Sequence, residues 1–268
     1  MADLQVAPAS VVYPCIFGIF VDPVQSPWKL KGRSWIFPLA PLSKVSSFPA
    51  GWSTPYQAEA LSTGGTFIGG IGQVQIVSYS ESPVGEREII DDELMYVPGR
   101  WKYSDGTKAW RITQIYVSTR VSIMNGRKNW NIPKHLADFD ISTTSDGTTT
   151  ISVSHPGTSV PFFKASTKKI PVVSSLSIHS STSVFGKYFG LVQPPLPVGE
   201  VPENVGTSQW AALTPILRGS TSLRTMTPGL AGKAGDGVGF PAVAPWPIAV
   251  SMENLDVEFG EAVMQDGV

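Results

Sequence analysis

The chain has 268 residues, of which 42% are hydrophobic and 15% are charged, and its formal net charge is −1. This apolar content is enough for a large core and excludes a disordered chain. The near-zero net charge excludes the basic field that attracts nucleic acid or an anionic membrane surface, so we expect neither as a partner.

The pattern of glycine, proline and apolar residues predicts a fold built mainly of strands. Alternation with a period of two residues predicts strands over residues 33–39, 73–80, 93–97, 115–124, 139–143, 149–154, 171–179, 209–217 and 247–259. Asp105-Gly106 and Asp146-Gly147 lie between such runs and predict antiparallel hairpins. Pro133 predicts one or two helical turns over residues 133–139, and helix is otherwise a minor component.

The organisation of the chain predicts a single domain over residues 1–268, because no break in composition and no internal repeat divides it. We expect mainly antiparallel sheets that curl into a barrel or cone-like cavity, with a few short helices. The glycine-rich segment 228–247 is unusually long for a loop inside a compact domain. We expect this segment to cover or border the mouth of a pocket.

The cysteine content and the apolar stretches indicate a cytoplasmic protein. Cys15 is the only cysteine, and no asparagine lies in an acceptor frame for glycosylation. The apolar stretch 11–21 is too short to span a bilayer and contains Pro14. We therefore expect neither a signal peptide nor a membrane anchor.

Motifs for metals, nucleotides and an ordinary serine nucleophile are missing from the sequence. The three histidines, His135, His155 and His179, do not have the spacing of metal ligands. The glycine-rich stretch 64–72 lacks the endings of a phosphate loop and of a dinucleotide-binding turn. We expect no metal and no cofactor.

The segment 125–137 places one lysine in apolar surroundings. Pro133 fixes the backbone directly before Lys134, and Trp130, Ile132 and Leu136 are close in sequence. Such a lysine is either a surface residue whose stem covers apolar neighbours or a desolvated, reactive amine.

This segment, Asn125-Gly-Arg-Lys-Asn-Trp-Asn-Ile-Pro-Lys-His-Leu-Ala137, resembles the signature of the acetoacetate decarboxylase family. The resemblance implies that Lys134 is the Schiff-base lysine. Trp28-Lys-Leu-Lys-Gly-Arg-Ser-Trp35 is similar to the family's early segment and implies that Arg33 binds the substrate carboxylate. The stretch 91–99 resembles the family's Tyr-X-Glu-Leu segment and implies that Glu93 is the active-site glutamate.

The departures from the family's pattern are close to the implied reacting centre. Gln75 stands where the family has a second glutamate, and His135 stands where it has a second lysine. The resemblance therefore implies a divergent branch with Pro-Lys-His in place of Pro-Lys-Lys. We expect Gln75 and His135, together with Arg33, to bind substrate.

The resemblance implies a Schiff-base-forming lyase that acts on a small-molecule keto substrate through Lys134, by an aldol, dehydration, cyclisation or decarboxylation step. One alternative is a pocket protein or cyclase that holds a polyketide-like compound without covalent chemistry. A second alternative is a non-catalytic binding domain. Members of the family commonly form homo-oligomers, and we expect one here.

Overall fold

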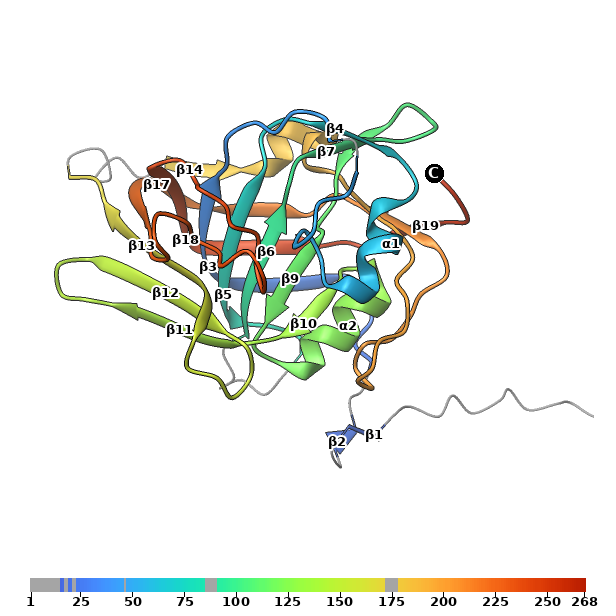
Figure 1. Cartoon of the computed structure of the whole chain (residues 1–268), viewed down its shortest axis with the longest axis horizontal. Coiled ribbons are helices and arrows are strands. Elements are labelled where there is room, and N and C mark those ends of the chain that lie inside the picture. The colour runs from blue at the N-terminus through green and yellow to red at the C-terminus, as the bar shows by residue number, and fades with distance from the viewer. Residues whose placement is uncertain (1–14, 17–18, 21–22, 46, 85–90, 172–177) are drawn as a thin grey trace, which may run out of the picture.

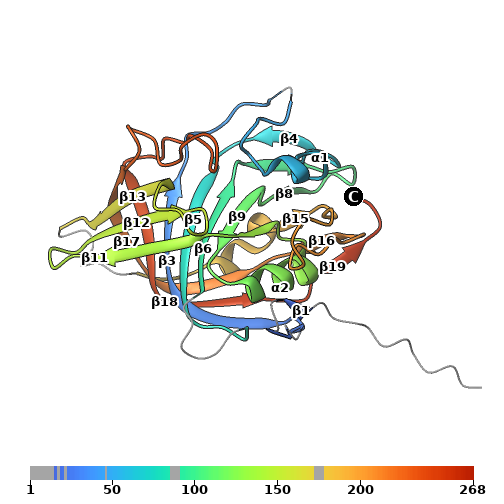
Figure 2. The same ribbon diagram turned by 60° about the horizontal axis from the view of Figure 1, so that its bottom comes forward.

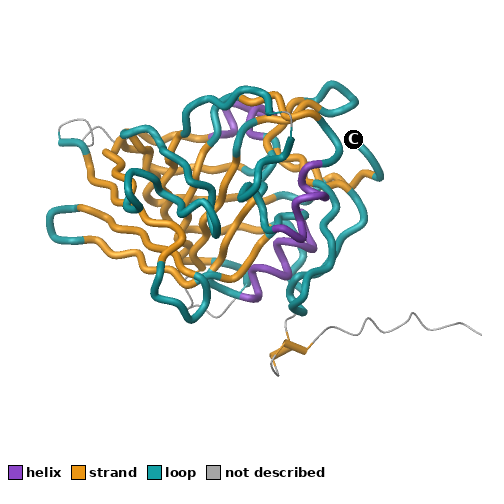
Figure 3. Tube along the Cα trace, in the orientation of Figure 1, coloured by secondary structure: helices purple, strands orange, loops and turns teal. Residues whose placement is uncertain are grey.

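The computed structural model describes residues 15–16, 19–20, 23–45, 47–84, 91–171 and 178–268. Strands dominate and helices are few (Figure 1, Figure 3), which confirms the mainly β prediction. The strands are β1 (Cys15–Ile16), β2 (Ile19–Phe20), β3 (Trp28–Pro38), β4 (Thr66–Gly69), β5 (Gln73–Glu81), β6 (Asp91–Val97), β7 (Arg100–Lys102), β8 (Lys108–Trp110), β9 (Gln114–Val117), β10 (Lys134–Leu136), β11 (Asp138–Thr143), β12 (Thr148–Ser154), β13 (Pro161–Lys169), β14 (Ile178–Ser181), β15 (Leu191–Gln193), β16 (Trp210–Leu213), β17 (Ile216–Pro228), β18 (Ile248–Phe259) and β19 (Val263–Gln265). The helical segments are η1 (Pro55–Gln57), α1 (Ala58–Ser62), α2 (Arg120–Trp130) and η3 (Thr182–Phe189). None of the helices in this described part has the length and apolar character of a membrane span.

The main sheet has eleven strands in the order β10-β9-β6-β5-β3-β18-β17-β13-β12-β11, with β14 paired to β17. All of these pairings are antiparallel except that of β9 with β10. Among the described strands no pairing joins β10 to β11, so the closure into a barrel that we expected is not confirmed. A second, six-stranded sheet, β19-β16-β15-β8-β7-β4, lies beyond the β9 end of the main sheet (Figure 2).

The main sheet is apolar on both faces. Along β3, Trp28 and Leu30 belong to one buried cluster, whereas Trp35 and Phe37 belong to another. Successive side chains of a strand point to opposite faces, so these clusters lie on the two sides of the sheet. We call the side of Leu30 the cavity face and the side of Trp35 the back face.

The predicted strand over residues 115–124 is wrong beyond Val117, because the chain enters helix α2 at Arg120. Thr119 caps this helix, and its hydroxyl accepts a hydrogen bond from the backbone N–H of Ser122. Asn131 ends the helix in the left-handed conformation, with φ of 54°. The alternating pattern that suggested a strand is overridden by these two caps.

The predicted helical turns over residues 133–139 are also wrong, since Lys134–Leu136 form strand β10 and Asp138–Thr143 form β11. Strand β10 pairs with β9 in parallel, and Lys134 is the partner of Ile115. Parallel neighbours need a crossover connection, which α2 provides. The sequence β9-α2-β10 is therefore a βαβ unit that brings Lys134 back to the edge of the main sheet.

Most of the other predicted elements are confirmed. Both Asp-Gly pairs lie in antiparallel hairpins, β7–β8 and β11–β12, and in each pair the glycine has positive φ. The strand predicted over residues 209–217 is interrupted, because β16 ends at Leu213 and β17 begins at Ile216. Residues 172–177 of the strand predicted over 171–179 lie outside the described residues.

Candidate active site

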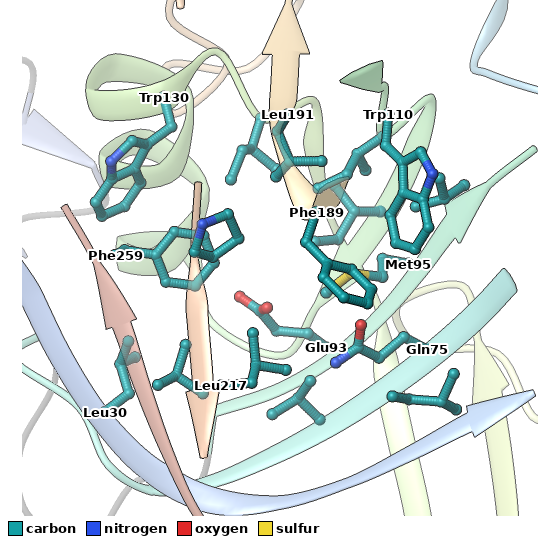
Figure 4. A pocket seen from close by; sticks show the side chains of 18 of the residues that line it. Leu30, Gln75, Glu93, Met95, Trp110, Trp130, Phe189, Leu191, Leu217 and Phe259 are labelled. Atoms are coloured by element: carbon teal, nitrogen blue, oxygen red, sulfur yellow. The ribbon is translucent and has the colours of Figure 1, made fainter. Parts of the chain in front are cut away.

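A cavity of about 150 Å³ lies against the cavity face of the main sheet. Most of its lining is apolar, and the polar lining residues are Gln73, Gln75, Tyr79, Asp91, Glu93, Lys134 and Thr182. Figure 4 shows Glu93 and Gln75 beside each other, with Trp130 and Phe259 on one side and Trp110 and Phe189 on the other. The cavity therefore offers a small polar group inside aromatic and aliphatic walls.

The register of the sheet explains why residues distant in sequence meet here. Gln75 pairs with Met95, Met95 with Ile115, and Ile115 with Lys134. Directly paired residues share a face of the sheet. Glu93 is two residues before Met95, so it lies on this face as well. The structure thus brings three of the expected site residues, Gln75, Glu93 and Lys134, to one cavity.

Lys134 is the centre of the polar group, and only 4% of its surface is exposed. Its Nζ forms an ion pair with Glu93 and donates a hydrogen bond of 2.8 Å to Ser122 Oγ. Ser122 belongs to the first turn of α2, so the crossover helix supplies this second partner. A buried ammonium requires such partners, because an unpaired buried charge is strongly destabilising.

Gly126 of helix α2 makes room for the lysine side chain. A Cβ atom at this position would lie 2.6 Å from both Cδ and Cε of Lys134. The side chain therefore passes directly over a glycine on its way to Glu93. The absence of a side chain here is a packing requirement rather than a turn requirement.

Asp91 and Tyr79 extend the polar group beyond the expected residues. Burial, and then the charge of Glu93, raises the pKa of Asp91 to about 7. Thr119 donates a hydrogen bond of 3.2 Å to Asp91 Oδ1, and the hydroxyl of Tyr79 donates one of 3.4 Å to Glu93. Burial also raises the pKa of Tyr79 well above its usual value. The cavity therefore holds two carboxyl groups near one amine.

Gln75 lies in the cavity wall as an amide. Its Nε2 donates a hydrogen bond of 3.3 Å to Ser34 Oγ, and its Oε1 accepts one of 3.3 Å from Gln73. An amide can donate and accept hydrogen bonds but does not release a proton near neutral pH. Gln75 can orient a substrate and cannot serve as its acid.

Arg33 is not among the lining residues, which corrects the expectation that it lies inside the cavity. Its position on β3 has the same parity as Trp35, and its guanidinium lies 5.0 Å from the ring centroid of that residue. Arg33 therefore lies on the back face, where its charge also acts on Asp92. No arginine is found among the residues that line the cavity in the described part of the chain.

His135 also lies away from the cavity, because it follows Lys134 on the same strand and points to the opposite side. Its Nε2 is 2.8 Å from Gln57 Nε2 and 3.3 Å from the hydroxyl of Thr54. Burial, and then the charge of Arg127, lowers the pKa of His135 to about 3. The imidazole is neutral and packed into the structure.

The segment 228–247 does not line the cavity, so the prediction of a lid is wrong. Phe240 is completely buried in the back-face cluster and packs against Tyr96 and Phe163. The carbonyl of Gly239 accepts hydrogen bonds from Tyr116 and Gln114. These contacts fasten the loop to the side of the sheet that is remote from Lys134.

Four participants in the site were not expected from the sequence, namely Tyr79, Asp91, Ser122 and Gly126. Asp91 precedes Glu93 by two residues, and the strand period could have placed it on the same face. Ser122 was missed because its segment was predicted as a strand, and Gly126 was missed because helix α2 was not predicted. Among the described residues no group of His, Cys, Asp and Glu could hold a metal ion.

Comparisons with solved structures reveal the type of fold. An acetoacetate decarboxylase from Legionella pneumophila is similar with a TM-score of 0.56 and 11% identity, over 98% of each chain. An acetoacetate decarboxylase-like enzyme from Sphingomonas wittichii RW1 has a TM-score of 0.58 and 10% identity, over 91% of this chain and 95% of that one. The fold is acetoacetate decarboxylase-like.

The enduracididine biosynthesis enzyme MppR has the same similarity in fold, with a TM-score of 0.53 and 15% identity over 90% of this chain and 88% of that one. No family model matches the sequence, and no curated protein matches it. At these identities the comparisons establish the fold, and the chemistry has to be argued from the side chains.

Proposed function

We propose that this protein is a Schiff-base-forming lyase that acts on a keto compound through Lys134. The observation that carries the proposal is a buried lysine amine, paired with Glu93, at the wall of an apolar cavity. MppR supports a keto group as the reacting centre, because that enzyme has been captured with pyruvate and with the condensation product of pyruvate and imidazole 4-carboxaldehyde.

The reaction begins when the ammonium of Lys134 gives up one proton and the amine attacks the carbonyl carbon. The carbinolamine that forms takes up a proton on its hydroxyl and loses water, which leaves a protonated imine on the lysine. Glu93 is in place to pair with this cation. The imine withdraws electrons from the neighbouring carbon, so a carboxylate, an aldol fragment or a proton can leave.

The walls favour an uncharged, apolar keto compound. The cavity volume of about 150 Å³ is similar to that of an engineered apolar cavity that binds benzene. A substrate carboxylate would face Asp91 and Glu93, and no arginine lines the cavity among the residues that the structure describes. Repulsion between like charges at short distance in such a site disfavours an anionic substrate.

Gln75 leads to a prediction about acetoacetate itself. An amide cannot replace a carboxylic acid in proton transfer, and general acid–base catalysis typically contributes about 10²–10⁴-fold. We expect carbon dioxide release from acetoacetate to be weak, and we expect a larger, more apolar keto compound to react better. Fast release by the wild-type protein that is abolished by Lys134→Ala would contradict this prediction.

The proposed imine is tested by reductive trapping. The protein is incubated with 4-phenyl-2-butanone, an uncharged apolar methyl ketone, and sodium cyanoborohydride, and the modified peptide is located by mass spectrometry. We expect a single adduct on Lys134 that is lost in Lys134→Ala and retained in Lys102→Ala, which removes an exposed lysine on β7. Adducts only on exposed lysines would refute the proposal.

The ion pair itself favours a second candidate. Because Glu93 and Ser122 both hold the ammonium form of Lys134, the amine is not nucleophilic until a proton leaves. A pocket protein or cyclase would use this ammonium as a hydrogen-bond donor to a carbonyl oxygen. Saturable binding of the ketone without any trapped adduct would select this candidate.

A further inference from the structure

Asp91 is a buried carboxyl group that the proposed reaction does not yet use. It lines the cavity, and only 2% of its surface is exposed. The hydroxyl of Thr119 donates a hydrogen bond of 3.2 Å to its Oδ1, and Ser122, also at the beginning of helix α2, lowers its pKa as a hydrogen-bond donor. Asp91 therefore touches both the cavity and the helix that covers Lys134.

The hydrogen bonds around Ser122 have a definite direction. The Nζ of Lys134 donates to Ser122 Oγ over 2.8 Å, so the serine oxygen is an acceptor in that contact. The hydroxyl keeps its own hydrogen, which it can donate to Asp91, the carboxyl group whose anion it favours. The serine hydroxyl therefore stands between the amine that donates to it and a carboxyl group that lines the same cavity.

We propose that Asp91 is the general acid and base of this site and exchanges protons with Lys134 through Ser122. This inference rests on the proposed function, since it assigns the proton transfers of imine formation. Ser122 is the relay, and Glu93 is the counter-ion of the nitrogen whenever the nitrogen carries a positive charge.

The proton balance of the step closes without a further reactant. The ammonium of Lys134 gives a proton to Ser122 while Ser122 gives its own to the Asp91 carboxylate, which leaves a neutral amine and a carboxylic acid. The amine adds to the carbonyl, and its nitrogen proton moves to the oxygen to give the carbinolamine. Asp91 then returns the first proton to this hydroxyl, which leaves as water while the protonated imine forms.

The surroundings of Asp91 suit this exchange. The charged or titratable groups that act on it are Glu93 from its own strand, Lys134 from β10 and Tyr79 from β5. Burial and Glu93 favour the acid, whereas Lys134 and the two hydroxyl groups favour the carboxylate. Because these effects oppose each other, both forms of Asp91 are accessible near neutral pH, as an acid–base group requires.

The test measures the rate of trapping with 4-phenyl-2-butanone and cyanoborohydride between about pH 6 and about pH 8. In Asp91→Asn we expect the rate to fall about 100-fold and its pH dependence to flatten, since one acid–base group is lost. Ser122→Ala should change both quantities in the same direction. Asp91→Glu retains the carboxyl group and should restore part of the rate.

Asp92→Asn is the matched control, because Asp92 is adjacent in sequence but does not line the cavity. A trapping rate and pH profile for Asp91→Asn equal to those of Asp92→Asn would overturn the relay while the imine stands. Absence of any adduct in the wild-type protein would instead overturn the proposed function, and the relay with it. Thermal melting identifies a variant that fails to fold, in which case Ser122→Ala and Asp91→Glu decide.

Discussion

At the scale of single residues, the amine of Lys134 needs both an oppositely charged partner and the space that a glycine leaves for its side chain. Glu93 supplies the opposite charge, and Gly126 supplies the space through which the side chain reaches it. These two requirements come from different elements, β6 and α2. A change in either element can therefore disable the amine while the fold persists.

The substitution Gly126→Ala tests whether Lys134 needs the space over this glycine. The new Cβ meets the flexible end of Lys134, which can move aside, and alanine favours a helix by up to about 1 kcal/mol over glycine. We expect trapping on Lys134 to be lost and the free energy of unfolding to fall, because displacement of the amine weakens its buried ion pair with Glu93. Urea denaturation and mass spectrometry measure the two effects. Gly260→Ala, where a Cβ meets nothing within 4 Å, is the control and should leave both unchanged.

The raised pKa of Asp91 leads to a second prediction for a single residue, which concerns the pH dependence of stability. Burial raises it to about 7, whereas an unfolded aspartate titrates near about 4. Between these values the folded chain binds the extra proton, so the free energy of unfolding falls as the pH rises through this window. Asp91→Asn removes the titration, so its stability relative to wild type should rise by on the order of 3 kcal/mol from about pH 4 to about pH 8.

Urea denaturation at several pH values measures this difference. Asp146→Asn is the control, because hydrogen bonds from Lys168 and Thr144 lower the pKa of Asp146. The stability that a lowered pKa provides is complete above the unfolded value and is lost only as the pH falls. The difference between this variant and the wild type should therefore stay constant from about pH 5 to about pH 8. A constant difference for Asp91→Asn as well would contradict the prediction.

At the scale of elements, strands that lie inside the main sheet could be predicted and the crossover could not. The alternation in β3, β5, β6, β12 and β18 reports burial against a sheet. The family resemblance pointed to Gln75 and Glu93, and both residues line the cavity. Apolar and polar residues alternate by chance in the segment after Val117, whereas its caps, Thr119 and Asn131, favour a helix. The role that the family resemblance implies for Arg33 does not fit its position, because Arg33 lies on the back face of β3 beside Trp35.

The loop 228–247, which was expected to cover the cavity, leads to a prediction about stability instead. Asp236 Oδ1 accepts the backbone N–H groups of Val238, Gly239 and Phe240, which fixes the turn that buries Phe240. Asp236→Ala should lower the free energy of unfolding by about 1–3 kcal/mol. Trapping on Lys134 should keep its wild-type rate, because the loop packs on the back face. Asp140→Ala, an exposed aspartate on β11, is the control for stability.

At the scale of the whole molecule, one sheet separates two apolar interiors with different tasks. The back face is filled by aromatic packing, while the cavity face leaves room for a ligand. Stability and binding are therefore supported by opposite sides of the same strands. A homo-oligomer stays a prediction from the family resemblance.

Ligand-induced stabilisation tests the cavity as a whole. A ligand that binds only the folded state stabilises it by about 2.7 kcal/mol when its concentration is 100 times its dissociation constant. Each kcal/mol of stabilisation raises the melting temperature by roughly 2–4 °C. We expect 4-phenyl-2-butanone to raise the melting temperature and 3-phenylpropanoate, of similar size but charged, to raise it less. A larger shift with the carboxylate would contradict the expectation of an uncharged substrate.

Because β10 pairs with β9, the number of residues before Lys134 decides which face of the sheet the amine occupies. A strand that slips by one residue exchanges its two faces. One residue inserted directly before Lys134 would turn the ammonium toward the aromatic packing of the back face. The inserted residue and His135 would then face the cavity and Glu93 instead. Every side chain would still be present, yet the nucleophile would be on the wrong side of the sheet. The short connection from α2 to β10 therefore tolerates changes of residue type far better than changes of length.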